Sequence, residues 1–347
     1  MKLSMQLAYS GGFEESARQV VDLESAGLDI AWVAEAYGFD GVSLMGYLAA
    51  ITDRVQIGAG ILPLYTRTPT LLAMTAAGVD ALSRGRCVLG LGASGPQVIE
   101  GWHGVPYDKP LARTREIVEI CRKVWAREER LTHDGPLYPL PLPAEKGTGL
   151  GKPLKIISHP VRSQIPIYVA ALGEKNVALT AEIADGWLPL FYMPERAREV
   201  FGASLDAGAA QRSPDLGPLD ICAGGLACIG SPEETKAALD MFARPLAALY
   251  IGGMGSKGQN FYNALVSRYG YEAEAAEIQD LYLAGRKDEA AAKVPDEFLE
   301  LSNLCGSEGF VKDRIAAFQE SGVTVLNVTP FGGDPVSIVE RLKSWTS

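Results

Sequence analysis

The stretch RGRCVLGLGASGPQVIEGWHGVPY, residues 84–107, decides the fold. It opens with a turn at Arg84–Gly85 and continues as an unbroken apolar run from Cys87 to Leu91. A run without polar alternation is typical of a parallel strand that is buried on both faces. Glycine-rich backbone and a Trp102–His103 pair follow it. Because α/β proteins bind ligands at the carboxyl ends of parallel strands, this stretch predicts a ligand site directly after the strand.

Strand-like and helix-like segments alternate along the chain and form eight strand–helix units. Eight such units in 347 residues predict a closed (β/α)8 TIM barrel with insertions, and the alternative is an open doubly wound sheet. The predicted strands are 3–9, 30–34, 55–62, 86–91, 165–171, 186–190, 219–229 and 324–329, and the predicted helices are 13–26, 42–52, 69–82, 110–127, 174–184, 194–208, 232–246 and 335–345.

Three stretches are longer than barrel connections require, and together they mark insertions near 92–164 and 250–323. We expect a single domain over residues 1–347 that carries these insertions. Long excursions from a compact domain are usually lids, binding loops or interface elements. The Pro/Gly-rich segment 136–153 is interpreted either as an ordered surface loop or as a lid.

Composition limits the partners of the chain. A net charge of −10 and a pI near 5.0 disfavour nucleic acid and anionic membranes, because phosphate neutralisation needs a basic surface. The sequence contains no run of about 18 apolar residues, so it predicts no transmembrane helix. The first residues lack the pattern of a signal peptide. Five dispersed cysteines without a CxxC motif argue against disulfides and zinc. A cytoplasmic location is therefore expected.

Four predicted strands end in residues suited to ligand binding. Glu35 follows the second strand, glycines interrupt the third at Gly58 and Gly60, and the fourth leads into GASG at 92–95. The fifth runs through small residues into a helix start, where free backbone N–H groups and Lys175 make a plausible phosphate site. Glu35 is interpreted either as a ligand-orienting carboxylate or as a residue that caps the next helix or pairs across the barrel mouth.

Familiar catalytic motifs are missing from the sequence. It contains no GxSxG elbow, P-loop, HExxH or correctly placed GxGxxG, and a total of three histidines disfavours a multi-histidine metal site. His103 is the one histidine with a catalytic interpretation, and its alternative is a loop-packing role. Scarce acid–base groups beside a ligand site indicate that a cofactor supplies the reactivity.

The chain resembles the luciferase-like monooxygenase superfamily, and within it the deazaflavin (coenzyme F420)-dependent oxidoreductases. The resemblance covers essentially the whole chain, and its most specific parts are the fourth-strand and fifth-strand segments. The matching text is AWVAEAYGFD (31–40), RVQIGAGILPLYTRTPTLLAMTA (54–76), LSRGRCVLGLGASGPQVIEGWHGVPYDKPLARTREIV (82–118), IPIYVAALGEKNVALTAEIADGW (165–187) and ALYIGGMGSKGQNFY (248–262).

The resemblance implies a bacterial luciferase-like barrel whose carboxyl end holds the cofactor. It implies a non-prolyl cis peptide at Gly60–Ile61, which forms a bulge against the central ring, and contact of Glu35 with that ring. The fourth-strand loop borders the ring system, and the fifth-strand turn receives the phosphate-bearing side chain. The implied cofactor-binding residues are Glu35, Gly60, Ile61, Ala93, Ser94, Gly95, Gln97, Ala170, Ala171, Gly173, Lys175 and Asn176.

One departure from the family narrows the chemistry. Some deazaflavin-dependent sugar-phosphate dehydrogenases carry a histidine after the acidic residue of the second strand and a glutamate in the fourth-strand loop. This chain has Ala36 and Gly95 at those positions, so the sugar-phosphate reaction is not expected. Glu35 and His103 remain the candidate catalytic residues, with Tyr37 as a further candidate for proton transfer.

The prediction is therefore an oxidoreductase that transfers a hydride between coenzyme F420 and a small organic substrate. An FMN-dependent two-component monooxygenase is the first alternative, and a non-catalytic flavin-binding or deazaflavin-binding protein is the second. The resemblance also implies a homodimer. Neither the substrate nor the direction of hydride transfer follows from the sequence.

Overall fold

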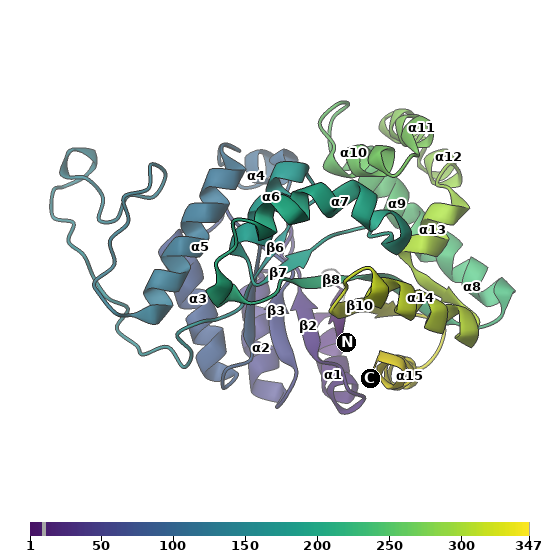
Figure 1. Cartoon of the computed structure of the whole chain (residues 1–347), viewed down its shortest axis with the longest axis horizontal. Coiled ribbons are helices and arrows are strands. Elements are labelled where there is room, and N and C mark those ends of the chain that lie inside the picture. The colour runs from purple at the N-terminus through teal and green to yellow at the C-terminus, as the bar shows by residue number, and fades with distance from the viewer. Residues whose placement is uncertain (9–11, 347) are drawn as a thin grey trace.

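Eight parallel strands close into a barrel in the computed structural model, which describes residues 1–8 and 12–346 (Figure 1). The ring closes because β10 pairs with both β8 and β1. The predicted (β/α)8 fold is confirmed, although Tyr9, the last residue of the first predicted strand, lies outside the described residues. In ring order the strands are β1 (Lys2–Gln6), β2 (Ile30–Val33), β3 (Gln56–Ala59), β5 (Cys87–Gly92), β6 (Ile167–Ala170), β7 (Gly186–Leu188), β8 (Asp220–Ile229) and β10 (Val325–Pro330).

Two short strands extend the ring at its rim. β4 (Leu62–Pro63) pairs with β5, and β9 (Leu304–Gly306) pairs with β8. The predicted third strand, 55–62, is thus two pieces, β3 and β4, with Gly60 and Ile61 between them. The peptide bond between these two residues is cis, as the resemblance implied.

The barrel interior is packed with side chains from alternate strand positions. Ile30 and Trp32 of β2 point into an inner cluster with Val88 and Tyr168, while Ala31 belongs to the larger apolar layer that includes the helices. This alternation explains why the strands read as continuous apolar runs, since both of their faces are buried.

The helices that surround the barrel follow the prediction closely at most positions. Side-chain caps fix several starts: Asp40 accepts a hydrogen bond from the Ser43 N–H (3.0 Å), and Thr68 accepts one from the Leu71 N–H (3.3 Å). The predicted helices correspond to α1 (Phe13–Ser25), α2 (Gly41–Ile51), α3 (Pro69–Leu82), α5 (Pro110–Ala126), α6 (Glu174–Ile183), α7 (Pro194–Ala209) and α15 (Pro335–Thr346).

The predicted helix 232–246 is confirmed as helical, and it is longer than predicted. It is a continuous series of α-helical and π-helical turns that runs to Gly253: α8 (Pro232–Ala238), η3 (Leu239–Ala243), α9 (Arg244–Ala248) and η4 (Leu249–Gly253). The helix that lies between α7 and α15 is α14 (Glu308–Glu320), a segment in which no helix was predicted. Both segments pack against β8, and α14 also packs against α7 and α15.

The excursions contain short helices of their own. Among the described residues, no helix is both long and apolar enough to cross a membrane. The additional elements are α4 (Pro96–Gly101), η1 (Ala144–Lys146), α10 (Phe261–Arg268), α11 (Glu272–Leu283), α12 (Lys287–Ala292) and α13 (Asp296–Ser302).

Candidate functional site

The four predicted strand ends lie side by side on one arc of the barrel. They follow β2, β3, β5 and β6, which are consecutive neighbours in the ring. A Cβ built on Gly92 would lie 2.9 Å from Ile61 Cγ1 and 3.5 Å from Ala170 Cβ. The third, fourth and fifth strand ends therefore form one continuous apolar surface. A side chain at position 92 would clash with Ile61, so this position requires glycine.

The turn after β6 leads into a helix start without a side-chain cap and leaves one buried side-chain oxygen unsatisfied. The N–H groups of Asn176 and Val177 both donate to the Gly173 carbonyl at 2.9 Å, and no side chain caps the helix. The side-chain oxygen Oδ1 of Asn176 is buried without a hydrogen-bond partner. An uncapped helix N-terminus attracts anions, so this turn retains one of the two features from which a phosphate site was predicted.

Lys175 lies on a different flank of α6. Its side chain is exposed and lines an outer groove of about 910 Å³ between α5, α6 and α7, together with Arg115, Glu116 and Glu182 among others. The groove lies on the outside of the barrel, between helices rather than at the strand ends. The role of Lys175 in phosphate binding stays a prediction.

Glu35 is fully engaged by protein groups. Its Oε1 lies 2.5 Å from Nη1 of Arg67, and its Oε2 accepts hydrogen bonds from Nη2 of Arg67 and from the Gly41 N–H, both at 2.8 Å. The hydrogen bond to Glu35 is the main cause of a raised pKa of the Arg67 guanidinium. Glu35 thus pairs across the rim and caps α2, the two structural roles considered for it, and its catalytic role stays a prediction.

The sequence reading missed Arg67 and Gln6 as parts of this rim. Arg67 comes shortly after β4, so its position on the same arc was the available signal. Gln6 ends β1, and a Cβ on Gly60 would lie 2.9 Å from Gln6 Oε1, while Nε2 of Gln6 donates to the Trp32 carbonyl at 3.2 Å. The neutral side-chain amide of Gln6 therefore lies beside the cis peptide bond.

The loop after β5 has an unusual backbone and an unsatisfied imidazole. Ser94 adopts a left-handed conformation with φ of 58°, which is uncommon for a non-glycine residue. Further along, the rings of Trp102 and Tyr37 lie 6.3 Å apart and join the loops after β5 and β2 at an exposed position. Nε2 of His103 is buried without a hydrogen-bond partner.

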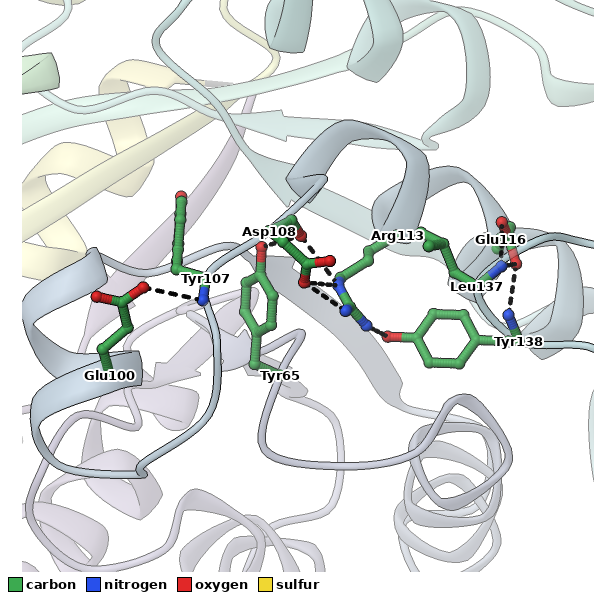
Figure 2. A network of polar contacts seen from close by, with 8 residues as sticks. All are labelled: Tyr65, Glu100, Tyr107, Asp108, Arg113, Glu116, Leu137 and Tyr138. Atoms are coloured by element: carbon green, nitrogen blue, oxygen red, sulfur yellow. Dashed lines mark hydrogen bonds and ion pairs between the residues drawn. The ribbon is translucent and has the colours of Figure 1, made fainter. Parts of the chain in front are cut away.

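A network of aromatic and charged side chains packs against the loop that follows β5. Figure 2 shows Arg113 of α5 between the Asp108 carboxylate and the Tyr138 hydroxyl, to which it donates at 2.5 and 2.8 Å. The guanidinium also lies over the Tyr65 ring, 5.2 Å from its centroid. The Tyr65 hydroxyl donates to the Asp108 carbonyl at 2.9 Å.

The same network reaches the fourth-strand loop through Tyr107. The rings of Tyr65 and Tyr107 lie 5.1 Å apart, and the Tyr107 hydroxyl donates to the Ser94 carbonyl at 3.4 Å. Burial raises the pKa of both tyrosines, so they are neutral hydrogen-bond donors at physiological pH. The position of Ser94 therefore depends on a series of contacts that begins at Arg113.

The assembled arc is suited to a flat, largely apolar ligand that carries an anionic group. Ile61, Gly92 and Ala170 offer the apolar surface, and the start of α6 offers N–H donors. Within residues 1–8 and 12–346, no cluster of histidine, cysteine, aspartate or glutamate is placed to hold a metal ion. The unpartnered polar atoms of Asn176 and His103 are the kind of group that a bound ligand satisfies.

Comparison with known proteins places these features in a family context. The sequence matches the luciferase-like monooxygenase family over residues 2–325. It is 44% identical over 342 residues, 97% of each chain, to a Mycobacterium tuberculosis protein provisionally named a coenzyme F420-dependent oxidoreductase. It is 28% identical to the 5,10-methylenetetrahydromethanopterin reductase of Archaeoglobus fulgidus, over 99% of this chain and 97% of that one.

A solved structure shares the whole architecture. The coenzyme F420-dependent tetrahydromethanopterin reductase of Methanopyrus kandleri superposes with a TM-score of 0.77 at 21% identity. The match covers 98% of this chain and 96% of that chain. At this level of identity the similarity shows the shared barrel fold.

Proposed function

This chain belongs to the luciferase-like monooxygenase family, and on that premise we propose that it is an oxidoreductase that transfers a hydride between coenzyme F420 and a small organic substrate. The observation that carries the choice of cofactor is the 44% identity, over 97% of both chains, to a protein provisionally named F420-dependent. The fold and the arc of strand ends support the same reading, because they provide a rim at which a planar cofactor can be held.

The residues present fit a deazaflavin. Ile61, Gly92 and Ala170 would lie against the ring, and the uncapped start of α6 with Asn176 would receive the phosphate. Ala93, Ser94, Gly95 and Gln97 would border the ring from the fourth-strand loop. When bound, the deazaflavin supplies the carbon that carries the hydride, and the protein supplies orientation and a dry environment.

Proton transfer requires a group that is not already committed to a protein partner. The two oxygens of Glu35 are occupied by Arg67 and the Gly41 N–H, so we assign Glu35 the role of holding the second-strand end in place. His103 has a buried, unpartnered Nε2 and is assigned the role of holding or moving the proton.

Titration of the purified full-length protein with coenzyme F420 and with FMN, followed by fluorescence, tests the cofactor assignment. We expect a dissociation constant for F420 of about 10 μM or below, with FMN at least about tenfold weaker. Tight binding of FMN without binding of F420 would favour the flavin monooxygenase reading and overturn the proposal.

Turnover tests the enzymatic claim separately. Reduced and oxidised F420 would be offered with small alcohols, imines and activated alkenes while the deazaflavin absorbance is followed. In His103→Asn we expect turnover to fall by about 10²-fold while the dissociation constant for F420 stays within about twofold. Binding of F420 without turnover in any of these reactions would instead support a non-catalytic binding protein.

A further inference from the structure

Two buried polar side chains lie on and beside α5, outside the candidate site. Glu116 belongs to α5, and His133 follows the end of that helix; their side chains are 8% and 5% exposed. Nε2 of His133 lies 3.3 Å from Oε2 of Glu116. A carboxylate that is withdrawn from water needs hydrogen-bond partners in the protein. The further partners of Glu116 therefore show what this pair holds in place.

A short hairpin, residues 133–140, surrounds the Glu116 carboxylate. His133 and Leu140 close the hairpin as an antiparallel bridge, in which the N–H of each residue donates to the carbonyl of the other at 2.8 Å. A Cβ on Gly135 would lie 2.2 Å from Oε2 of Glu116. The backbone of the hairpin is therefore packed directly against the carboxylate.

The hairpin carries Tyr138 from Glu116 to Arg113. Oε2 of Glu116 accepts hydrogen bonds from the N–H groups of Leu137 at 3.3 Å and Tyr138 at 2.9 Å. The Tyr138 ring packs against the apolar layer of the helices, and its hydroxyl accepts a hydrogen bond from Nη1 of Arg113 at 2.8 Å. Figure 2 shows Tyr138 between the two charged residues, with its backbone at the carboxylate and its hydroxyl at the guanidinium.

The Tyr138 hydroxyl determines the orientation of the Arg113 guanidinium together with Asp108. Nε and Nη2 of Arg113 donate to Asp108, whereas Nη1 donates to Tyr138. The guanidinium also lies over two rings, 5.2 Å from the centroid of Tyr65 and 5.5 Å from that of Tyr138. Loss of the Tyr138 hydroxyl would leave the guanidinium bound along one edge only.

The rings beyond Arg113 lead to the fourth-strand loop, which follows β5. Tyr65 lies under the guanidinium, and its ring is 5.1 Å from that of Tyr107. The Tyr107 hydroxyl donates to the Ser94 carbonyl at 3.4 Å, and the Tyr107 N–H donates to Oε1 of Glu100 at 3.1 Å. Because packed side chains transmit displacements to their neighbours, a shift of the guanidinium reaches this loop.

We infer that Tyr138 and Glu116 are positioning residues for the fourth-strand loop. Glu116 binds the hairpin, the hairpin presents the Tyr138 hydroxyl to Arg113, and Arg113 holds the rings that contact the Ser94 carbonyl. The start of the segment that was interpreted as a surface loop or a lid thereby supports the site through α5. The effect on cofactor binding rests on the proposed function, whereas the effect on the order of the loop does not.

Hydrogen–deuterium exchange of the full chain without cofactor tests the role of Tyr138, with peptides that cover residues 92–107 as the readout. In Tyr138→Phe we expect amide exchange in these peptides to be about fivefold faster than in the wild type, because a hydrogen bond to a charged group is lost while the ring remains. Other peptides should exchange as in the wild type, and the melting temperature should stay within about 2 °C. Unchanged exchange over 92–107 would overturn the inference.

Two further comparisons test the order of the contacts. Glu116→Ala should accelerate exchange over 92–107, whereas Glu116→Gln, which keeps an oxygen for the hairpin N–H groups, should stay close to the wild type. In the Arg113→Ala background, Tyr138→Phe should add nothing, because Tyr138 acts through Arg113. Wild-type exchange in Glu116→Ala, or additive effects of the Arg113 and Tyr138 substitutions, would contradict this order.

Tyr271→Phe is the matched control. Its hydroxyl donates to the Glu297 carboxylate, in the excursion before β9, so a tyrosine hydroxyl with a charged partner is lost there as well. Exchange over 92–107 should not change in this variant. An acceleration equal to that in Tyr138→Phe would show that the loop responds to any such loss, and it would overturn the inference.

Titration with coenzyme F420 connects the loop to the cofactor. The dissociation constant should rise about fivefold in Tyr138→Phe and stay at the wild-type value in Tyr271→Phe. Equal binding by the wild type and Tyr138→Phe would overturn the link to the cofactor. If the wild type does not bind F420 but the loop peptides respond as expected, the proposed function fails and the positioning role is supported.

Discussion

At the residue scale, Glu35 is a candidate site residue whose role is determined by the groups that bind its carboxylate. A carboxylate after the second strand was compatible with a ligand role and with a structural role. The structure gives it a guanidinium and a backbone N–H as partners, with side-chain exposures of 9% for Glu35 and 13% for Arg67. A nearly buried pair of this kind is costly to break because one charge is left behind.

Glu35→Gln should therefore destabilise the protein by about 2–4 kcal/mol, because Arg67 would be left as an unpaired buried charge. Urea unfolding at neutral pH measures this loss. Arg67→Met in the same background should recover part of the stability. If Glu35→Gln unfolds like wild type but loses turnover, the carboxylate acts on the substrate or the cofactor rather than on Arg67.

Gly58 is a second residue at which one added atom should change the stability of the fold. A Cβ at this position would lie 2.2 Å from the ring of Trp32 inside the barrel. Gly58→Ala should cost about 3 kcal/mol, the upper part of the usual range for overpacking. Thermal unfolding monitored by circular dichroism checks it, with Gly101→Ala as the control because its Cβ would meet open space. Equal melting temperatures for the two variants would contradict the packing argument.

At the scale of elements, α5 contributes to the site without supplying a residue at a strand end. Arg113 on this helix holds Asp108 and packs on Tyr65, which in turn contacts Tyr107 and so the Ser94 carbonyl (Figure 2). Arg113 is thus a positioning residue for the fourth-strand loop. Its effect on ligand binding is transmitted through contacts that are continuous in the structure.

Arg113→Ala should weaken F420 binding by about tenfold, because misplacing the loop by a fraction of an ångström lowers the fit of the bound ring. The control is Arg115→Ala on the same helix, whose guanidinium pairs with Glu182 on the outer flank at 2.6 Å and does not contact the loop. Fluorescence titration of both variants decides the matter. Similar binding in Arg113→Ala and wild type would contradict the positioning role.

Glu24 links α1 to the turn before β3. Its carboxylate accepts hydrogen bonds from the N–H groups of Val55, Arg54 and Asp53, the first at 2.6 Å. Burial acts to raise the pKa of Glu24, and these hydrogen bonds outweigh it, so the pKa is lowered below its ordinary value. The folded state therefore binds this proton less readily than the unfolded state, and the stabilisation is lost as the pH falls.

Glu24→Gln should cost about 1–2 kcal/mol at neutral pH, where the stabilisation by the carboxylate is complete. The difference from wild type should shrink at about pH 3.5, below the ordinary carboxyl pKa, because the unfolded wild-type chain then binds the proton more readily than the folded protein does. Urea unfolding at the two pH values measures this difference in the free energy of unfolding. Glu14→Gln, at a well exposed residue of the same helix, serves as the control. A difference that grows as the pH falls would contradict the assignment.

At the scale of the whole molecule, the barrel and the helices packed around it bury every thiol of the chain. All five cysteines are free and buried, and burial raises the pKa of Cys222 and of Cys305 to about 12. The thiolate is the reactive form, so both access and ionisation oppose modification.

Native protein should therefore react with an aromatic disulfide reagent at a rate limited by unfolding, with well under one thiol per chain modified within about minutes at pH 8. In denaturant all five should react at once. Absorbance of the released thiolate gives the count. Rapid modification of one thiol in the native state would show a local opening of the barrel that the structure does not contain.

The sequence by itself determined the barrel, and it predicted a site at the ends of four neighbouring strands. Unbroken apolar strands such as Cys87–Leu91 require burial on both faces, and the small residues that follow them predict the close approach of a ligand. These are local signals, because each depends on a few consecutive residues. The cis peptide at Gly60–Ile61 followed from the family resemblance, not from propensity.

Only the tertiary structure decided which side chains are free to act. Glu35 is neutralised by Arg67, 32 residues away, and the loop that carries Ser94 depends on Arg113 of α5. The tertiary structure also places Lys175 on an outer flank of α6. The helix between α7 and α15 is α14 rather than the helical segment that follows β8. Hydrogen bonds and ion pairs between distant segments leave no periodic trace in a sequence, since they depend on where the closed ring brings each strand end.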